Sequence, residues 1–153
     1  MQFTTVGRIL AIDFGRKRCG VAVTDPLQIV AGGLSTVATS EILTFVKKYV
    51  SEEVVDLLVV GEPHQMNGDE SETMNYIRPF LGNLHKALPA LNVVMVDERF
   101  TTKIAQRAII QGGVSKKDRN NKSGLVDMVS AQIILETYLD MKNSGTLSIV
   151  TSY

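Results

Sequence analysis

The chain has 153 residues, about the length of one domain, and its 44% hydrophobic and 21% charged residues are ordinary for a globular protein. Its formal net charge of +0 points to no partner for the molecule as a whole. The single cysteine, Cys19, excludes an internal disulfide framework, which fits a reducing compartment. No signal segment opens the chain, and no apolar run approaches the ~20 residues that a bilayer requires. We therefore expect a cytoplasmic protein that has no membrane partner.

Three strands begin the predicted fold. The apolar runs at 7–14 and 19–25 are joined by a turn over 15–18, a pattern that predicts a β-hairpin. A third strand is expected near 29–38, after a short polar connection.

Helices and strands then alternate. Ser40 is placed to cap a helix over 41–53, and the apolar run at 55–61 is typical of a strand buried on both faces. A helix over about 71–88 and a second buried strand at 92–96 follow. Three strands followed by this alternation predict an α/β domain with a mixed five-stranded sheet.

Two more helices are predicted after the last of these strands. One is expected between Thr101 and Gly112, and a long one over about 123–142. The single domain would therefore span residues 1–142. Residues 143–153 are interpreted as a C-terminal tail, in which TLSIVTSY would add an edge strand.

Acidic residues stand where two of the predicted strands end. Asp13 ends the apolar run of the first strand, and Asp97 and Glu98 directly follow the strand at 92–96. In open α/β sheets, ligands bind beyond the carboxyl ends of the parallel strands. Acids at two such ends can therefore converge on one place.

The last helix supplies a third carboxylate. Helical periodicity places Asp127 on the face that also carries Ile134 and Tyr138, which should pack against the sheet. Considered alone, Asp127 is better explained by the helix dipole, which stabilises an acid in a first turn. Considered with Asp13 and Glu98, it is better explained as part of a functional cluster, because a buried carboxylate needs a partner.

Three carboxylates without a cluster of Cys or His suit a hard cation such as Mg²⁺ or Mn²⁺ rather than zinc. His64 and His85 have no spacing that suggests a metal site and are interpreted as solvated residues. The segment from Arg99 to Lys122 carries seven Lys or Arg and one acid, and it begins beside Glu98. It is either a solvated basic loop or, given the neighbouring carboxylates, a track for a phosphate backbone.

Four segments together resemble the YqgF/RuvX family. They are RILAIDFGRKRCGVAVTD, VVGEP with the NG that follows it, DERFTT and NKSGLVDMVSAQIILETYL, in this order over residues 8–141. That family comprises RNase H-like nucleases of the Holliday junction resolvase type that are implicated in maturing the 5′ end of pre-16S rRNA. The resemblance implies an RNase H-like fold, in which the first three strands of the sheet are antiparallel.

The resemblance also implies roles for single residues. The acidic triad of the family would correspond to Asp13, Glu98 and Asp127, which their positions had already singled out. Its basic positions, expected to contact the nucleic-acid backbone, would be Arg16, Arg18, Arg99 and Lys122. Glu62 departs from the family pattern, which commonly has an apolar residue there. We expect Glu62 at the rim of the metal site, either as a water-mediated ligand or as an exposed bystander.

The leading hypothesis is a nuclease in which the three carboxylates hold one or two Mg²⁺ or Mn²⁺ ions that activate water for attack on a phosphodiester. Structured RNA is favoured over branched DNA only by the usual assignment of the family. The chain has no aromatic-rich segment, which favours recognition of backbone and shape over bases. One alternative is a Holliday-junction resolvase acting on DNA, for which a homodimer would suit two symmetric strands better than a monomer. The other is a nucleic-acid-binding ribosome-assembly factor without catalysis.

Overall fold

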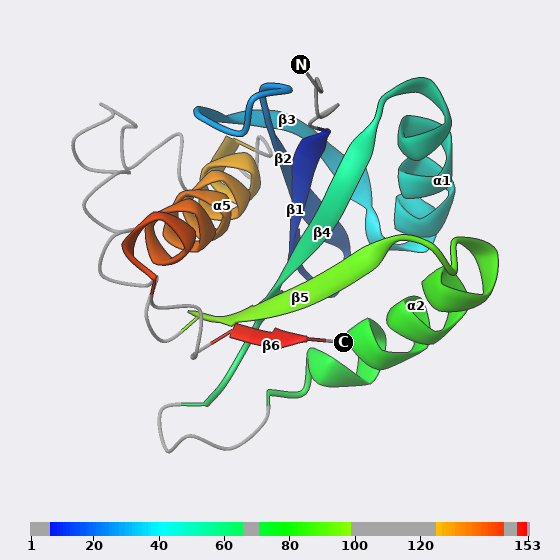
Figure 1. The fold of residues 1–153 in the computed structure, drawn as a ribbon. Coiled ribbons are helices and arrows are strands. Elements are labelled where there is room, and N and C mark those ends of the chain that lie inside the picture. The colour runs from blue at the N-terminus through cyan, green and yellow to red at the C-terminus, as the bar shows by residue number, and fades with distance from the viewer. Residues whose placement is uncertain (1–6, 66–70, 99–124, 146–149, 153) are drawn as a thin grey trace.

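A mixed sheet forms the centre of the fold, and helices cover both of its faces (Figure 1). The computed structural model describes residues 7–65, 71–98, 125–145 and 150–152. One long helix packs on one face, and two helices pack on the other (Figure 1). Within these described ranges, no helix is both long and apolar enough to cross a membrane.

The sheet confirms the predicted α/β class and the antiparallel arrangement of the first three strands. Its strands are β1 (Arg8–Phe14), β2 (Arg18–Thr24), β3 (Ala31–Ala38), β4 (Val55–Glu62), β5 (Asn92–Asp97) and β6 (Val150–Ser152). The strand order is β3-β2-β1-β4-β5-β6. β1 pairs antiparallel with β2 and β2 with β3, whereas β4 runs parallel to both β1 and β5. The carboxyl ends of β1, β4 and β5 therefore meet at one edge of the sheet.

The C-terminal segment adds a sixth strand to the five that were predicted. β6 pairs antiparallel with β5, with Val150 opposite Val96, so part of TLSIVTSY does form an edge strand. The preceding helix α5 (Leu125–Ser144) ends two residues after the boundary expected at 142. The helix expected between Thr101 and Gly112 lies outside the described residues.

The two helices on the other face are α1 (Ile42–Glu52) and α2 (Met74–Ala87). The expectation that Ser40 caps α1 was wrong, because a short 3₁₀ turn over Thr39–Glu41 precedes the helix and no side chain caps it. The Thr39 hydroxyl donates a hydrogen bond to the carbonyl of Gly15 instead, which ties this turn to the end of β1. Sequence alone could not show that contact.

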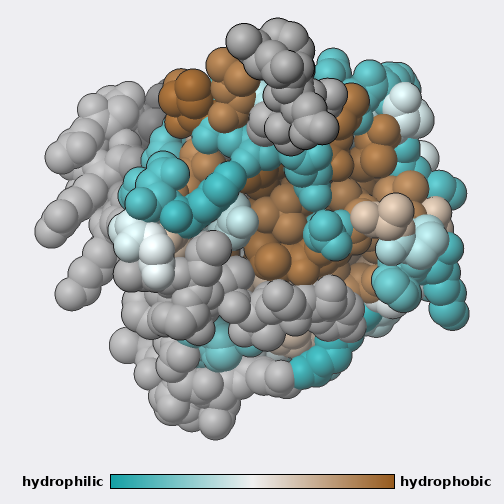
Figure 2. All heavy atoms as spheres, viewed as in Figure 1, coloured by the Kyte–Doolittle hydropathy of each residue, from teal (hydrophilic) through white to brown (hydrophobic). Residues whose placement is uncertain are grey.

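Alternation along β1 divides the buried residues between two cores. Leu10 and Ile12 pack with α1 and α2, whereas Ile9 and Ala11 pack with α5. β1 is therefore apolar on both faces, which explains its continuous hydrophobic run. In the view of Figure 2, hydrophobic residues gather over the sheet between α5 and the α1/α2 pair, and hydrophilic residues lie on either side of them. The same alternation decides on which face each polar residue at a strand end lies.

Candidate active site at the carboxyl ends of the parallel strands

Asp13 is the last residue but one of β1 and lies on the α5 face. It continues the alternating set that begins with Ile9 and Ala11, which pack against α5. It stands opposite Gly20 of the neighbouring strand β2, so no side chain crowds it from that position. Asp13 is partly buried, unlike the core residues that precede it in the strand.

Glu98 reaches the same face from the end of β5. It directly follows the last residue of that strand and shares the alternation of Val94 and Val96, which face α5. The β4 residue beside it is Gly61, and a Cβ at this position would collide with the Glu98 carboxyl. Gly61 therefore leaves the space that the carboxyl group of Glu98 occupies.

The carboxyl groups of Asp13 and Glu98 are hydrogen-bonded to each other. Burial, the charge of Asp13 and this hydrogen bond raise the pKa of Glu98 to about 9. Burial also raises the pKa of Asp13, against the hydrogen bond from Glu98, and the negative charge of Asp127 raises it further. Glu98 therefore keeps its proton at neutral pH and donates it to Asp13, because two carboxylates this close cannot both ionise without a cation.

Asp127 lies in the first turn of α5, next to β2. Its backbone carbonyl would collide with any Cβ at Gly20, so glycine permits the helix to approach this closely. Its carboxylate accepts a hydrogen bond from Arg18 Nε at 2.6 Å. The charge of Asp127 thus acts on Asp13, but the ion-pair partner of Asp127 is Arg18.

The structure brings some of the predicted site residues together but does not describe all of them. Asp13 and Glu98 are in direct contact, and the Arg18–Asp127 pair lies beside them. Among the described residues, no three His, Cys, Asp or Glu side chains are already arranged to hold a metal ion. Arg99 and Lys122, two of the four predicted basic contacts, lie outside the described residues.

The turn between β1 and β2 presents the other two predicted basic residues. Arg16 is exposed and Arg18 is partly buried. Together with Gly15, Lys17 and Asp127 they line a cavity of about 250 Å³. Lys17 was missed by the sequence analysis, although its place between two arginines in a strand turn was a usable signal.

Glu62 lies on the opposite face from the Asp13–Glu98 pair. It continues the alternation of Leu58 and Val60, which face α1 and α2. Its Oε1 is 3.3 Å from His64 Nε2, and the same nitrogen is 3.6 Å from Asp97 Oδ2. The interpretation of His64 as a solvated residue was therefore wrong, because its side chain is only 13% exposed between these two acids.

The donor atoms fit a hard divalent cation. Carboxylate oxygens are the ligands that Mg²⁺ and Mn²⁺ prefer, and Asp13, Glu98 and Asp127 supply only such oxygens. The proton that Glu98 donates to Asp13 marks a place where positive charge is needed, and Gly61 makes room there for the Glu98 carboxyl. These three residues could therefore hold the metal once Arg18 yields one oxygen of Asp127.

The mixed sheet and the acids at its edge define an RNase H-like domain. A solved structure of Thermus thermophilus RuvC in complex with a Holliday junction substrate has this fold, with a TM-score of 0.58 over 96% of this chain and 99% of that chain at 17% identity. A family model described as RuvX, Holliday junction resolvase, matches residues 7–141. The chain belongs to this family, and it is a nuclease, a hydrolase that acts on nucleic acid.

Curated relatives agree with the family. A protein of Porphyromonas gingivalis named "Putative pre-16S rRNA nuclease" is 56% identical over 88% of this chain and 97% of its own length. A protein of Phocaeicola vulgatus with the same name is 55% identical over 90% of this chain and 98% of its own length. The chain therefore matches these relatives along nearly their whole length.

Proposed function

We propose that the protein cleaves phosphodiester bonds in structured RNA with Mg²⁺ or Mn²⁺ held by Asp13, Glu98 and Asp127. The observation that carries this proposal is the hydrogen-bonded pair of Asp13 and Glu98, in which burial and mutual repulsion hold the pKa of Glu98 at about 9. A buried pair of acids with only a structural role would lower the stability of the fold and contribute nothing that offsets this loss. A pair that awaits a divalent cation explains that cost, because functional sites hold groups with perturbed pKa values.

The residues of this chain divide the work. When bound, the metal supplies an activated water and stabilises the charge that develops on the phosphate. Asp13 and Glu98 would orient and hold the cation at the end of the sheet, in place of the proton that Glu98 otherwise holds. Arg18 holds Asp127 in place through the hydrogen bond from its Nε, and its positive charge lies beside the site where the phosphate backbone would approach.

The cellular task that we propose is maturation of pre-16S rRNA, carried out in the cytoplasm. The names of the Porphyromonas and Phocaeicola relatives support it, since they match this chain at 56% and 55% identity. A second candidate is resolution of four-way DNA junctions, which the description of the matching family favours. RNA cleavage needs only a monomer, whereas junction resolution would need a homodimer to address two symmetric strands.

A cleavage panel separates the two candidates. Structured RNA, single-stranded RNA and a four-way DNA junction are incubated with the protein in Mg²⁺, Mn²⁺ or EDTA. We expect cleavage of structured RNA with either ion and none in EDTA. Cleavage of the junction alone would favour resolution, and cleavage that persists in EDTA would contradict the metal-dependent mechanism.

Two variants and a control connect that activity to the site. Asp13→Asn and Asp127→Asn should abolish cleavage while binding of RNA survives. Asp140→Asn is the matched control, because Asp140 is an exposed acid on the same helix as Asp127. A protein that binds RNA but cleaves none of the substrates in any ion would instead be the non-catalytic assembly factor.

A further inference from the structure

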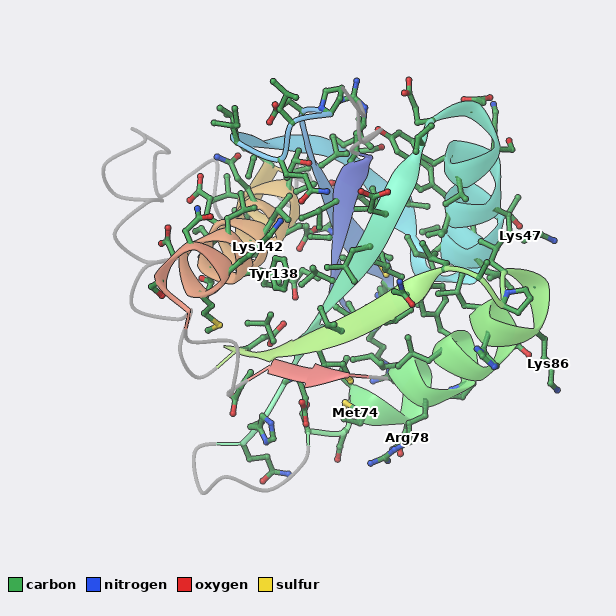
Figure 3. The ribbon with its side chains drawn as sticks, in the orientation of Figure 1. Lys47, Met74, Arg78, Lys86, Tyr138 and Lys142 are labelled. Carbon is green, nitrogen blue, oxygen red and sulfur yellow. The ribbon has the colours of Figure 1, made fainter. Side chains whose placement is uncertain are left out.

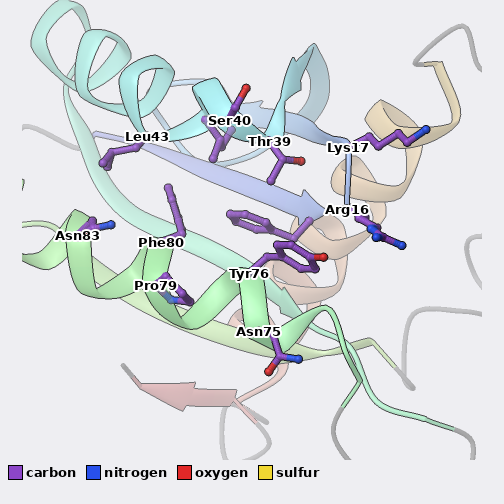
Figure 4. A pocket seen from close by; sticks show the side chains of 12 residues that line it. Arg16, Lys17, Thr39, Ser40, Leu43, Asn75, Tyr76, Pro79, Phe80 and Asn83 are labelled. Atoms are coloured by element: carbon purple, nitrogen blue, oxygen red, sulfur yellow. The ribbon is translucent and has the colours of Figure 1, made fainter.

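A second, larger cavity lies on the other side of the turn between β1 and β2. Its volume is about 550 Å³, within the range of small-molecule and cofactor sites. It opens between the end of β1, the start of α1 and the first turns of α2, on the face opposite α5 (Figure 4). None of the functions assigned so far uses it.

The wall of this cavity combines an apolar base with a cationic and polar rim. Phe14 and Phe80 form the base, with ring centroids 4.8 Å apart. Tyr76 is 41% exposed, and its ring lies at the same end of the cavity as Arg16 (Figure 4). Lys17 adds a second cation, and none of the described residues that line the cavity is acidic.

The polar groups at the rim are available to a ligand. Arg16 and Lys17 form no ion pair within the described part of the chain. Pro79 lies inside α2 and has no N–H, so it cannot donate the helical hydrogen bond to the carbonyl of Asn75. That carbonyl therefore lacks its usual helical donor, and Asn75 lines the cavity.

The turn that carries the two cations is rigid and separates this cavity from the smaller one beside Asp127. Arg16 and Lys17 line both cavities. The Thr39 N–H donates to the carbonyl of Lys17 at 3.0 Å, and the Thr39 hydroxyl donates to the carbonyl of Gly15 at 2.8 Å. Two hydrogen bonds therefore fix the turn before a ligand arrives, which lowers the entropy that binding must overcome.

We propose that this cavity binds one unpaired nucleotide of the substrate strand, with its base on the Tyr76 ring and its phosphate at Arg16 and Lys17. The proposal rests on the proposed nuclease function and adds a subsite to it. An exposed aromatic ring beside cations is the arrangement that single-stranded nucleic acid recognises, because every base has a face that stacks. A strand that crosses the turn would place a neighbouring phosphate beside Asp127.

This subsite changes the expectation of pure backbone recognition. A single tyrosine is not an aromatic-rich segment, so a stacking position could not be predicted from the sequence. It becomes one because α2 places Tyr76 beside a turn that is far from it in sequence. The enzyme would then prefer substrates with an unpaired nucleotide next to the cleaved bond, such as a single-stranded extension that joins a duplex.

Binding tests the proposal without cleavage. The full chain is titrated in EDTA against two labelled RNA duplexes of equal length, one blunt and one with a short unpaired extension. Tyr76→Ala should weaken binding of the extended RNA by about 5- to 150-fold, the loss of one base stack, and leave the blunt RNA unchanged. Tyr76→Phe should bind like the unsubstituted protein, because it keeps the ring.

The control lies on the same helix. His85 is an exposed ring near the end of α2 that does not line the cavity, so His85→Ala should leave both affinities unchanged. A fluorescent 2-aminopurine in the extension gives a direct readout of stacking. Its emission should be quenched on binding to the unsubstituted protein and to Tyr76→Phe, but not on binding to Tyr76→Ala.

Several results would overturn the subsite, and they differ from those that would overturn the nuclease. Equal affinity of Tyr76→Ala and the unsubstituted protein for the extended RNA would overturn it, and so would an equal loss for both RNAs or no binding of either. If binding follows the prediction but no substrate is cleaved in Mg²⁺ or Mn²⁺, the subsite stands and the nuclease proposal fails. If RNA is cleaved but Tyr76→Ala changes neither affinity, the nuclease proposal stands and the subsite fails.

Discussion

Asp13 and Glu98 share a hydrogen bond although β4 lies between the strands that carry them. β1 and β5 are not neighbours in the sheet, so the two carboxyl groups meet across the width of one strand. Gly61 of β4 makes this contact possible, because a Cβ at that position would collide with the Glu98 carboxyl. The pair therefore depends on three strands, and the central one contributes by lacking a side chain.

Gly61→Ala should damage the site more than the fold. The new Cβ would collide with the Glu98 carboxyl and lie 2.6 Å from Ile134 Cδ1, both of which are the ends of side chains that can shift. We expect a loss of about 1–3 kcal/mol in the free energy of unfolding, as for other overpacked sites. Metal-dependent cleavage should fall far more steeply, because the displaced carboxyl is a proposed metal ligand.

Gly82→Ala is the matched control for this variant. Gly82 is an exposed residue inside α2, and a Cβ there would meet no atom within 4 Å. Alanine should stabilise the helix by about 0.5–1 kcal/mol and leave cleavage unchanged. Urea unfolding and cleavage rates measured on both variants would check this, and full activity of Gly61→Ala would contradict the role of Gly61.

Glu98→Gln should stabilise the protein in EDTA at alkaline pH. Because the pKa of Glu98 is raised from 4.5 to about 9, the folded state keeps a proton that the unfolded state has lost between these values. The stability that this proton confers is complete below the unfolded pKa and is lost as pH rises through the folded pKa. Glutamine mimics the protonated acid at every pH, so its advantage over glutamate should grow from pH 5 to pH 9.

The measurement is the urea midpoint of both proteins at pH 5, 7 and 9 with EDTA present. Glu136→Gln provides the control, since Glu136 is an exposed acid on α5 whose side chain accepts a hydrogen bond from Gln132 on the same helix. It should shift the midpoint little and without this pH trend. A midpoint difference between Glu98→Gln and the unsubstituted protein that stays constant with pH would refute the raised pKa.

The two acids of the pair could be predicted because each ends an apolar strand. A run of hydrophobic residues fixes the strand, alternation fixes the face, and parallel neighbours bring the carboxyl ends together. The family resemblance selected the same residues independently. The sequence also predicted the α/β class and the antiparallel start of the sheet, because hydrophobic periodicity and short turns determine both.

Contacts between distant segments could not be predicted in the same way. The Arg18–Asp127 pair joins a strand turn to the last helix, and no local pattern encodes that approach. His64 follows a strand in a polar loop, which is typical of a solvated residue, yet tertiary packing places it between Glu62 and Asp97. Such contacts depend on how loops fold back over a sheet edge, and one sequence read locally does not contain this information.

Asp25→Ala should lower stability at neutral pH but not in acid. The Asp25 carboxylate accepts hydrogen bonds from the N–H groups of Val30, Ile29 and Leu27, and these bonds lower its pKa below the usual 3.8. A carboxyl with a lowered pKa stabilises the fold above its unfolded pKa and loses that effect as pH falls through the folded pKa. The urea midpoints of variant and unsubstituted protein should therefore differ at pH 7 and converge in strong acid.

A matched substitution separates the effect of losing a negative charge from the effect of losing the hydrogen bonds within the turn. Asp140→Ala also removes an exposed acid, but Asp140 lies inside α5 rather than in a loop that its carboxylate could hold. Its midpoint should follow that of the unsubstituted protein at both pH values. If Asp25→Ala were as stable as the unsubstituted protein at pH 7, the three hydrogen bonds would contribute nothing to the loop.

Arg16→Ala should reduce the salt dependence of RNA binding. A cation that contacts phosphate releases condensed counterions, and on single strands the slope of log K against log[salt] is about −0.7 for each neutralised phosphate. Removing Arg16 should flatten the slope by roughly this amount for every RNA sequence. Lys47→Ala is the control, because Lys47 is exposed on α1 and points away from the sheet (Figure 3). If Lys47→Ala flattened the slope and Arg16→Ala did not, nucleic acid would bind the outer face of α1, and the carboxylates at the sheet edge would lose their substrate.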